Sequence, residues 1–322
     1  MRKPLFICPL LVLMFLISTP DAFPAEGPLF ISNSHPLFLS VGTPPFLSAR
    51  PEDSFAAHLN YSSTYLIKSS EEWDAEIDLE TMLLEFRFTK VVLSGTEISF
   101  TIPLISYNSG VLDGFLDWYH DALGFSDYGR SERPLNEFLF RVSHKGEVVI
   151  EGESGRLGFG DVQVGIKQPI LKGDPYLSLY GYIELPTGDA EHGYGNEDVD
   201  WGLLLLIDKD LSRAFTLYLN AGMVFVKSYT AQEEIDLSDY PYAALGLEWV
   251  YSESLSANAQ VSFQGSPYDT GIREIDGTAS ILSLAGRYAF TKHASLELSF
   301  SEDLNTAGAP DFMIETSYRY TF

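Results

Sequence analysis

Long segments of the chain alternate between apolar and polar side chains with a period of two residues. At the C-terminus, one face carries the alternate positions from Phe312 through Tyr318 and Tyr320 to Phe322, and the other face is mostly polar. Successive side chains of a β-strand point to opposite faces of a sheet, so this pattern predicts strands with one apolar and one polar face. The same alternation recurs at 215–225, 255–264 and 295–300.

A closed transmembrane barrel needs this pattern, because its outer face meets lipid and its lumen is polar. A soluble β-sandwich also alternates. We favour the barrel because the strands are long, the chain ends on an aromatic residue inside a strand, and short connections alternate with long, acidic ones. The predicted fold is therefore all-β, a transmembrane antiparallel up-and-down barrel.

The connections give an expected number of strands. Short turns, which we expect on the periplasmic side, fall at 290–293, 252–255, 208–212, 171–174, 144–146 and 94–95. Counting from them predicts about fourteen strands, an even number as in bacterial barrels. The two strands that flank His144–Gly146 are short, and twelve strands is the alternative if these two do not span the membrane. The longest outer loop contains a predicted helix at 109–124, where apolar residues recur at helical spacing.

Residues 1–25 are predicted to be a secretory signal peptide. Arg2 and Lys3 precede an apolar stretch that is too short to span a bilayer, and small residues follow it. Cleavage is expected between Ala22 and Ala25. The mature chain would divide into an N-terminal plug or arm at 26–50 and a barrel at 51–322.

The N-terminal segment of the mature chain is both apolar and rich in proline. Proline supplies no hydrogen-bond donor to a ladder, so residues 27–50 make a poor central strand. An apolar segment is also poorly suited to free solution. Our hypothesis is that it folds into the lumen as a plug, with Asn33 and His35 among its polar contacts. The alternative is a flexible or periplasm-facing arm.

Composition narrows the classes of function. The net charge of −25 disfavours nucleic acid, whose phosphates would be repelled. The single cysteine, Cys8, excludes a disulfide scaffold. The chain has neither a glycine-rich phosphate loop nor a Cys/His zinc pattern, so we expect no cofactor and no metal.

One pair of residues has the spacing of a catalytic constellation. His293 and Ser295 lie two residues apart on a predicted strand, so both share a face, as a base and a nucleophile require. That face is the lumen, and the pair lies at a short inner turn, away from the lipid of the outer leaflet. We therefore expect no enzyme, and an outer-membrane lipid hydrolase is only a minor alternative.

Several short motifs point to a family. The segment Gly27-Pro28-Leu29 with Asn33 and Pro36 resembles an uncharacterised Gram-negative outer-membrane β-barrel family, a domain of unknown function. So do the 110–124 helix and the motifs at 158–161 and 185–189, which are also similar to those of barrels for uptake of hydrophobic compounds. The resemblance implies the outer membrane of a Gram-negative bacterium and, by analogy of fold, passage of apolar small molecules.

The function we expect is an outer-membrane channel or transporter for small molecules, hydrophobic ones among them. The alternative is a structural or surface-interaction barrel with a closed lumen. The expected partners are the lipid of the outer membrane, periplasmic chaperones, the barrel-assembly machinery and a small-molecule solute. The C-terminal residues Tyr318, Tyr320 and Phe322 are the expected signal for that machinery, by resemblance to outer-membrane proteins. The wall residues predicted to face the lumen are Gln163, Lys167, Tyr180, Tyr182, Glu184, Glu248, Gln260, Gln264, Glu297 and Arg319.

Overall fold

The computed structural model describes residues 26–112, 114, 118 and 134–322. The predicted signal peptide and most of the helix predicted at 109–124 lie outside these residues. Among the described helices, none has the length and apolar character needed to cross a bilayer.

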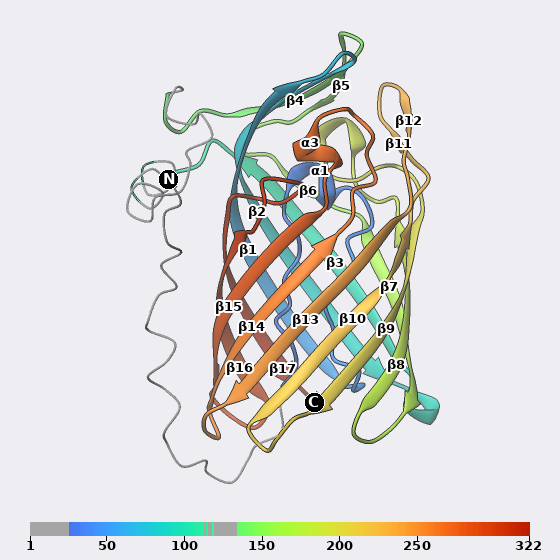
Figure 1. Ribbon diagram of the computed structural model, residues 1–322, viewed down its shortest axis with the longest axis vertical. Coiled ribbons are helices and arrows are strands. Elements are labelled where there is room, and N and C mark those ends of the chain that lie inside the picture. Colours follow the sequence, from blue (N-terminus) through green and yellow to red (C-terminus); the bar gives the residue numbers. More distant parts are fainter. Residues whose placement is uncertain (1–25, 113, 115–117, 119–133) are drawn as a thin grey trace, which may run out of the picture.

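The described part of the chain forms a closed ring of twelve strands, in which every strand pairs antiparallel with its two neighbours (Figure 1). The last strand pairs with the first, from Ser54–Thr321 to Ser63–Phe312, and so closes the ring. The ring strands, in order, are β1 (Ser54–Ser69), β2 (Trp73–Val91), β3 (Glu97–Asn108), β7 (Val162–Leu171), β8 (Tyr176–Leu185), β9 (Asp200–Asp210), β10 (Phe215–Phe225), β13 (Tyr240–Val250), β14 (Leu255–Gln264), β15 (Ala279–Ala289), β16 (Ala294–Asp303) and β17 (Phe312–Thr321).

The two ends of the barrel differ. Tight connections at 92–96, 172–175, 211–214, 251–254 and 290–293 gather at one end, which we call the short-turn end. The opposite, long-loop end carries the 3-10 turn η4 (Ala190–His192), the hairpin of β11 (Ser228–Thr230) with β12 (Glu234–Asp236), and the short helix α3 (Arg273–Asp276). A further 3-10 turn, η2 (Leu93–Gly95), lies in the first of the tight connections. Figure 1 shows the long-loop end at the top.

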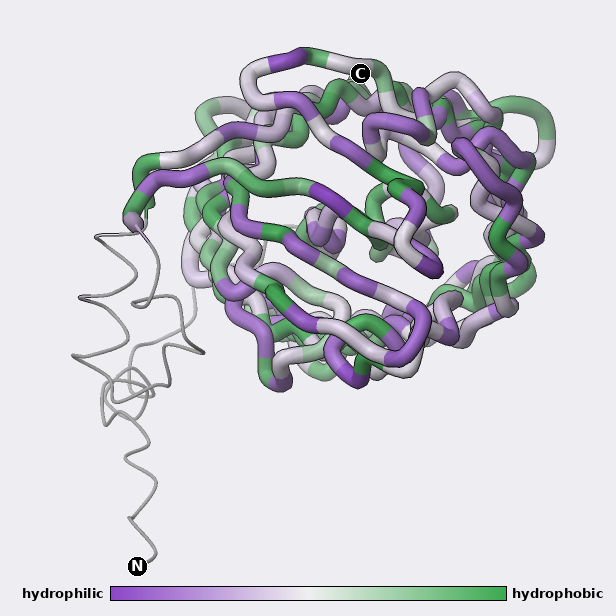
Figure 2. The backbone as a smooth tube through the Cα atoms, turned by 90° about the horizontal axis from the view of Figure 1, so that it is seen from above, coloured by the Kyte–Doolittle hydropathy of each residue, from purple (hydrophilic) through white to green (hydrophobic). Residues whose placement is uncertain are grey.

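The alternation in the sequence becomes the two faces of this wall. On β16, Ser295, Glu297 and Ser299 are buried inside the ring, whereas Leu296 and Leu298 are exposed on its outside. The other ring strands repeat the pattern, so the outer surface is apolar and suited to lipid, and the interior is polar. Figure 2 looks along the barrel and shows chain segments inside the ring.

The prediction of about fourteen strands is wrong, and the alternative of twelve is confirmed. The two short strands that made the difference exist as β4 (Leu139–His144) and β5 (Glu147–Glu151), but they lie outside the ring. β4 pairs with the outermost part of β2, where His144 is opposite Trp73. The turn at 144–146 is therefore at the long-loop end and not, as predicted, on the periplasmic side. β6 (Leu157–Phe159) is a further short strand that pairs with β3.

Candidate functional site

Residues 26–53 form a two-limbed segment inside the barrel. The first limb enters at the short-turn end and rises to the helix α1 (Pro36–Leu39) near the long-loop end. The second limb descends to Ser54, where β1 begins. Both limbs are largely buried, with Leu29, Phe38 and Phe46 at most 2% exposed. The lumen is therefore occupied by the chain's own N-terminal segment, which we call the plug segment.

A buried ion cluster holds the start of the plug segment. Arg287 on β15 contacts Glu248 at 2.9 Å and Glu297 at 2.6 Å, and its Nη2 atom also donates to the carbonyl oxygen of Gly27 at 3.0 Å. Glu248 in turn accepts from the backbone N–H of Gly27 at 3.3 Å. The cluster is satisfied on all sides, which is the condition under which buried charges are tolerated.

A second set of contacts holds the end of the plug segment, again near the short turns. Asp208 on β9 accepts from the N–H of Ala49 at 2.9 Å and from the hydroxyl of Ser48 at 2.6 Å. Lys167 on β7 forms a buried ion pair with Glu97 at 2.9 Å and also donates to the carbonyl oxygen of Arg50. Side chains of the wall therefore bind backbone atoms of the plug segment at both places where the segment reaches the short-turn end.

Amide and phenol side chains hold the middle of the plug segment. Gln260 accepts from the N–H of Leu29 at 3.1 Å, and Asn220 accepts from the N–H of Leu47 at 2.9 Å. Tyr182 and Tyr240 both donate to the carbonyl oxygen of Gly42, at 2.6 and 3.1 Å. These wall groups satisfy backbone atoms that neither helix nor sheet would satisfy.

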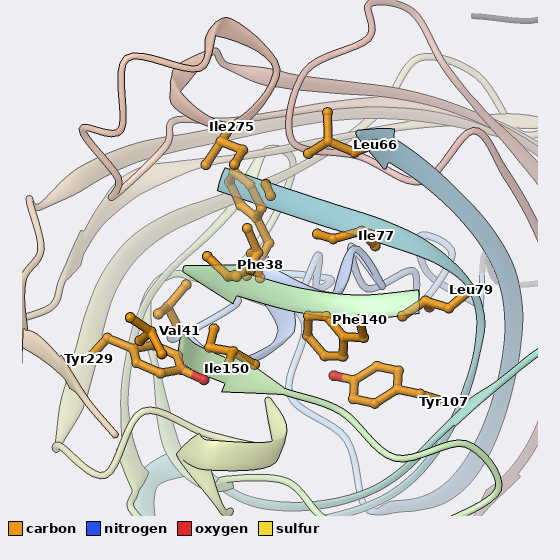
Figure 3. Close-up of a cluster of buried hydrophobic side chains, with 14 of the residues drawn as sticks. Phe38, Val41, Leu66, Ile77, Leu79, Tyr107, Phe140, Ile150, Tyr229 and Ile275 are labelled. Atoms are coloured by element: carbon orange, nitrogen blue, oxygen red, sulfur yellow. The ribbon is translucent and has the colours of Figure 1, made fainter. Parts of the chain in front are cut away.

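An apolar cluster closes the lumen at the long-loop end (Figure 3). Phe38 and Val41 of the plug segment pack there with Ile77 and Leu79 of β2 and with residues from the strands outside the ring. The latter include Phe140 on β4 and Ile150 on β5. β4 and β5 therefore contribute to closure although they do not cross the membrane.

Of the twelve residues predicted for the plug and lumen, eleven are buried inside the ring, and Arg319 is partly exposed, with 21% of its side chain accessible. Asn33 donates to Gln264 at 3.3 Å, and the Nδ1 atom of His35 accepts from Leu37 N–H at the start of α1. The wall residues are Gln163, Lys167, Tyr180, Tyr182, Glu184, Glu248, Gln260, Gln264, Glu297 and Arg319. Tyr318, Tyr320 and Phe322 are on the outside at the short-turn end, 38–72% exposed.

Sequence reasoning missed several buried charged groups. Arg287, Arg87 and Asp208 lie on the polar faces of their strands, as Ser283 does on β15. Strand parity could have found them, since each alternates with apolar outward residues. No signal in the sequence shows that Arg287 and Glu248, 39 residues apart, form one cluster.

A cavity of about 420 Å³ lies beside the seam that closes the ring. The register of β1 with β17 ends at Ser63–Phe312, whereas β1 continues to Ser69. The cavity follows this extension of β1 and is bounded by the 304–311 connection, α3 and His35 of the plug segment. Its size is in the range of about 300–1,000 Å³ that small-molecule sites occupy. Its lining mixes apolar groups, such as Leu66 and Ala309, with charged ones, such as Lys68 and Asp311.

Two smaller cavities lie deeper in the barrel, one on each side of Phe30. The first, about 40 Å³, is lined by three carboxyl side chains, Glu85, Asp161 and Glu184. The second, about 60 Å³, is nearer the short-turn end, and its lining contains more basic than acidic side chains, among them Arg87 and Lys167. Among the described residues, no three His, Cys, Asp or Glu side chains are placed to hold one metal ion.

The pair with catalytic spacing is not joined in the structure. His293 is exposed, and its Nδ1 atom lies 2.9 Å from the carbonyl oxygen of Thr321. Ser295 is 6% exposed and faces the lumen.

Solved structures show which fold this chain resembles. The COG4313 outer membrane channel from Pseudomonas putida F1 matches with a TM-score of 0.55 and 13% identity, over 84% of this chain and 96% of that chain. The NanC porin matches with a TM-score of 0.49 and 7% identity, over 83% of this chain and 98% of that chain. The Pseudomonas putida toluene transporter TodX matches with a TM-score of 0.39 and 13% identity, over 89% of this chain and 92% of that chain. The first of these likenesses shows the fold: this chain has the barrel fold of an outer membrane channel.

The family follows from the sequence itself. Residues 6–322 match the profile of DUF3187, described as a protein of unknown function, and the chain belongs to that family. The resemblance to an uncharacterised outer-membrane barrel family is thereby confirmed. No curated protein matches the chain.

Replacing Arg287 by methionine should strongly destabilise the folded barrel. Glu248 and Glu297 would then be buried without their cation, a change that typically costs about 3–5 kcal/mol. Arg141→Met is the matched control, because the Arg141–Glu151 pair is 47% and 57% exposed and such pairs contribute about 0–1 kcal/mol. Urea unfolding of the refolded proteins measures both. Equal losses in the two variants would contradict the assigned role of the cluster.

The stability of the barrel should depend on His35 at acid pH. Burial lowers the pKa of His35 from 6.5 to about 3, so between these values the unfolded chain binds a proton that the folded chain does not. Stability from this group is complete above pH 6.5 and is lost as the pH falls toward 3, by up to about 1.4 kcal/mol per pH unit. His35→Asn keeps an N-cap and lacks this titration. Urea midpoints at pH 7 and pH 5 should therefore fall less in H35N, and parallel profiles would refute the prediction.

Proposed function

We propose that this protein is an outer-membrane channel or transporter for small molecules, hydrophobic ones among them, with the plug segment closing its aqueous lumen. The single observation that carries the proposal is the cavity of about 420 Å³ beside the seam between β1 and β17. It lies where the two strands that close the ring stop pairing, so a solute can reach it without entering the filled lumen.

The lining favours a solute with an apolar body and a polar group. Leu66 and Ala309 offer apolar surface, and Lys68, Arg273 and Glu274 surround it with charge. His35 connects the cavity to the plug segment, because it is both a lining residue and the cap of α1. Occupation of the cavity could therefore be coupled to the position of α1. This mixed lining supports a small molecule that has both an apolar body and a polar group.

The filled lumen favours a second candidate, a structural barrel with a permanently closed interior. Wall side chains contact the plug segment from its start at Glu26 to Arg50, through both limbs. The two candidates differ in whether solute passes.

Removing residues 26–50, which make up most of the plug segment, should open an aqueous path. We expect the mature chain to give few conductance steps in planar bilayers, and a chain lacking residues 26–50 to give steps at the same voltage, because the wall alone surrounds a polar lumen. Heat-dependent gel mobility checks that both are folded. Equal conductance in the two would contradict the assignment of 26–50 as a plug.

Filling the seam cavity should stop passage of small apolar solutes. Leu66 is 6% exposed and lines the cavity, so Leu66→Trp should reduce uptake of a radiolabelled monoaromatic hydrocarbon into proteoliposomes by several-fold. Leu59→Trp is the control, since Leu59 is on the same strand, 38% exposed on the outer face. Uptake that equals that of empty liposomes in the unmodified protein would favour the structural barrel instead.

A further inference from the structure

The smaller cavity on the short-turn side of Phe30 differs in charge from the rest of this acidic protein. It is lined by four cationic side chains, Arg50, Arg87, Lys167 and Arg319, and by two carboxylates, Glu52 and Glu97. The chain as a whole carries a net charge of −25. A local excess of positive charge inside such a protein attracts anions.

Three of the four cations have a carboxylate partner. Lys167 pairs with Glu97 at 2.9 Å, Arg319 pairs with Glu52, and Arg50 pairs with Asp210 at 2.8 Å. Arg87 is different. It is 5% exposed, its one hydrogen bond to a side chain is a long contact to Thr101 at 3.4 Å, and its Nη2 atom has no partner. A buried guanidinium with an unsatisfied donor and no carboxylate in direct contact is unfavourable, so an anion beside Nη2 would stabilise it.

The acidic residue nearest along the strand does not fill this role. Glu85 lies two residues before Arg87 on β2 and accepts from the hydroxyl of Ser32 at 2.9 Å. It lines the other cavity, beyond Phe30. The Phe30 ring stacks on His58 with centroids 3.9 Å apart, and Arg87 lies 5.8 Å from the same ring. Phe30 therefore forms a boundary between an acidic and a basic cavity.

A second unsatisfied group lines the same basic cavity. His58 on β1 is 7% exposed, and its Nδ1 atom is 2.6 Å from the hydroxyl of Ser317. Its Nε2 atom is buried without a partner. When Ser317 donates to Nδ1, the proton of the neutral ring is on Nε2, which then is a donor. Two unpartnered nitrogen atoms, one of them charged, thus belong to side chains that line one cavity.

We propose that the cavity lined by Arg87 and His58 binds a small anion, either a halide or the carboxylate group of formate or acetate. The volume of about 60 Å³ exceeds the ~10–15 Å³ that one water needs, and suits an ion of a few atoms. The site lies between the plug segment and the wall, because Gly27, Phe30 and Phe46 complete its lining. The bound anion neutralises Arg87 and joins the plug segment to β1 and β2.

The test compares anions at constant sodium concentration and ionic strength. The Tm of the refolded mature protein is measured in chloride, bromide, formate, acetate and gluconate, the last being too large for the cavity. We expect a higher Tm in the small anions than in gluconate, and the order among them distinguishes a halide from a carboxylate. Arg87→Met should abolish the difference, and His58→Gln should reduce it. Arg141→Met, which removes an exposed guanidinium elsewhere, should keep it.

A bromide-soaked crystal of the unmodified protein supplies a measurement that does not depend on any variant folding. An anomalous peak beside Arg87 Nη2, together with the Tm difference, is the expected result. A peak without any Tm difference would mean an adventitious ion only and would overturn the proposal. So would equal Tm values in all five salts with no peak, because water would then fill the cavity. These outcomes are independent of whether the barrel transports solute.

Discussion

Arg287 is the contact on which the interior depends. A barrel in a membrane has a polar inner face by construction, and this one contains carboxylates such as Glu248 and Glu297 that water does not reach. One guanidinium contacts both carboxylates and also donates to the carbonyl oxygens of Gly27 and Pro28. The same side chain, Arg287, therefore both offsets buried negative charge in the wall and fixes the position of the plug segment. Without the segment, the wall amides and phenols would lose their partners, and without the wall, the segment would be an unstructured proline-rich chain.

The same logic explains why the lumen is divided by charge. Phe30 of the plug segment lies between a cavity lined by three carboxyl side chains and a cavity lined by more basic than acidic side chains. Glu85 and Arg87 are two residues apart on one face of β2, but each lines a different cavity. The structure tolerates this arrangement because most of the charges have other partners.

Much of the architecture could be predicted from the sequence, because a transmembrane wall imposes period two on every strand. The last strand, Phe312–Thr321, is the segment whose alternation was clearest. The strand number was overestimated for a physical reason. β4 and β5 are real strands and have the expected composition. However, β4 pairs with the part of β2 that extends beyond the ring, and β5 pairs with β4. Local pattern cannot distinguish pairing within the ring from pairing above it. The proline content of 27–50 excluded a central strand, whereas the grouping of Arg87, His58 and Phe30 arises only when β1, β2 and the plug segment meet.

The order of these elements along the chain has a consequence for how the protein is assembled. The plug segment precedes every strand in the chain. Its residue Gly27 nevertheless contacts Glu248 on β13, 221 residues later, and Arg287 on β15, 260 residues later. Closure of the ring by β17 on β1 must then enclose a segment whose binding groups arrive among the last. Contacts so distant in sequence carry a large entropic cost before they form, which slows folding. The plug segment, which is joined to β1 at Ser54, can therefore reach its final position only after the later strands of the wall have formed.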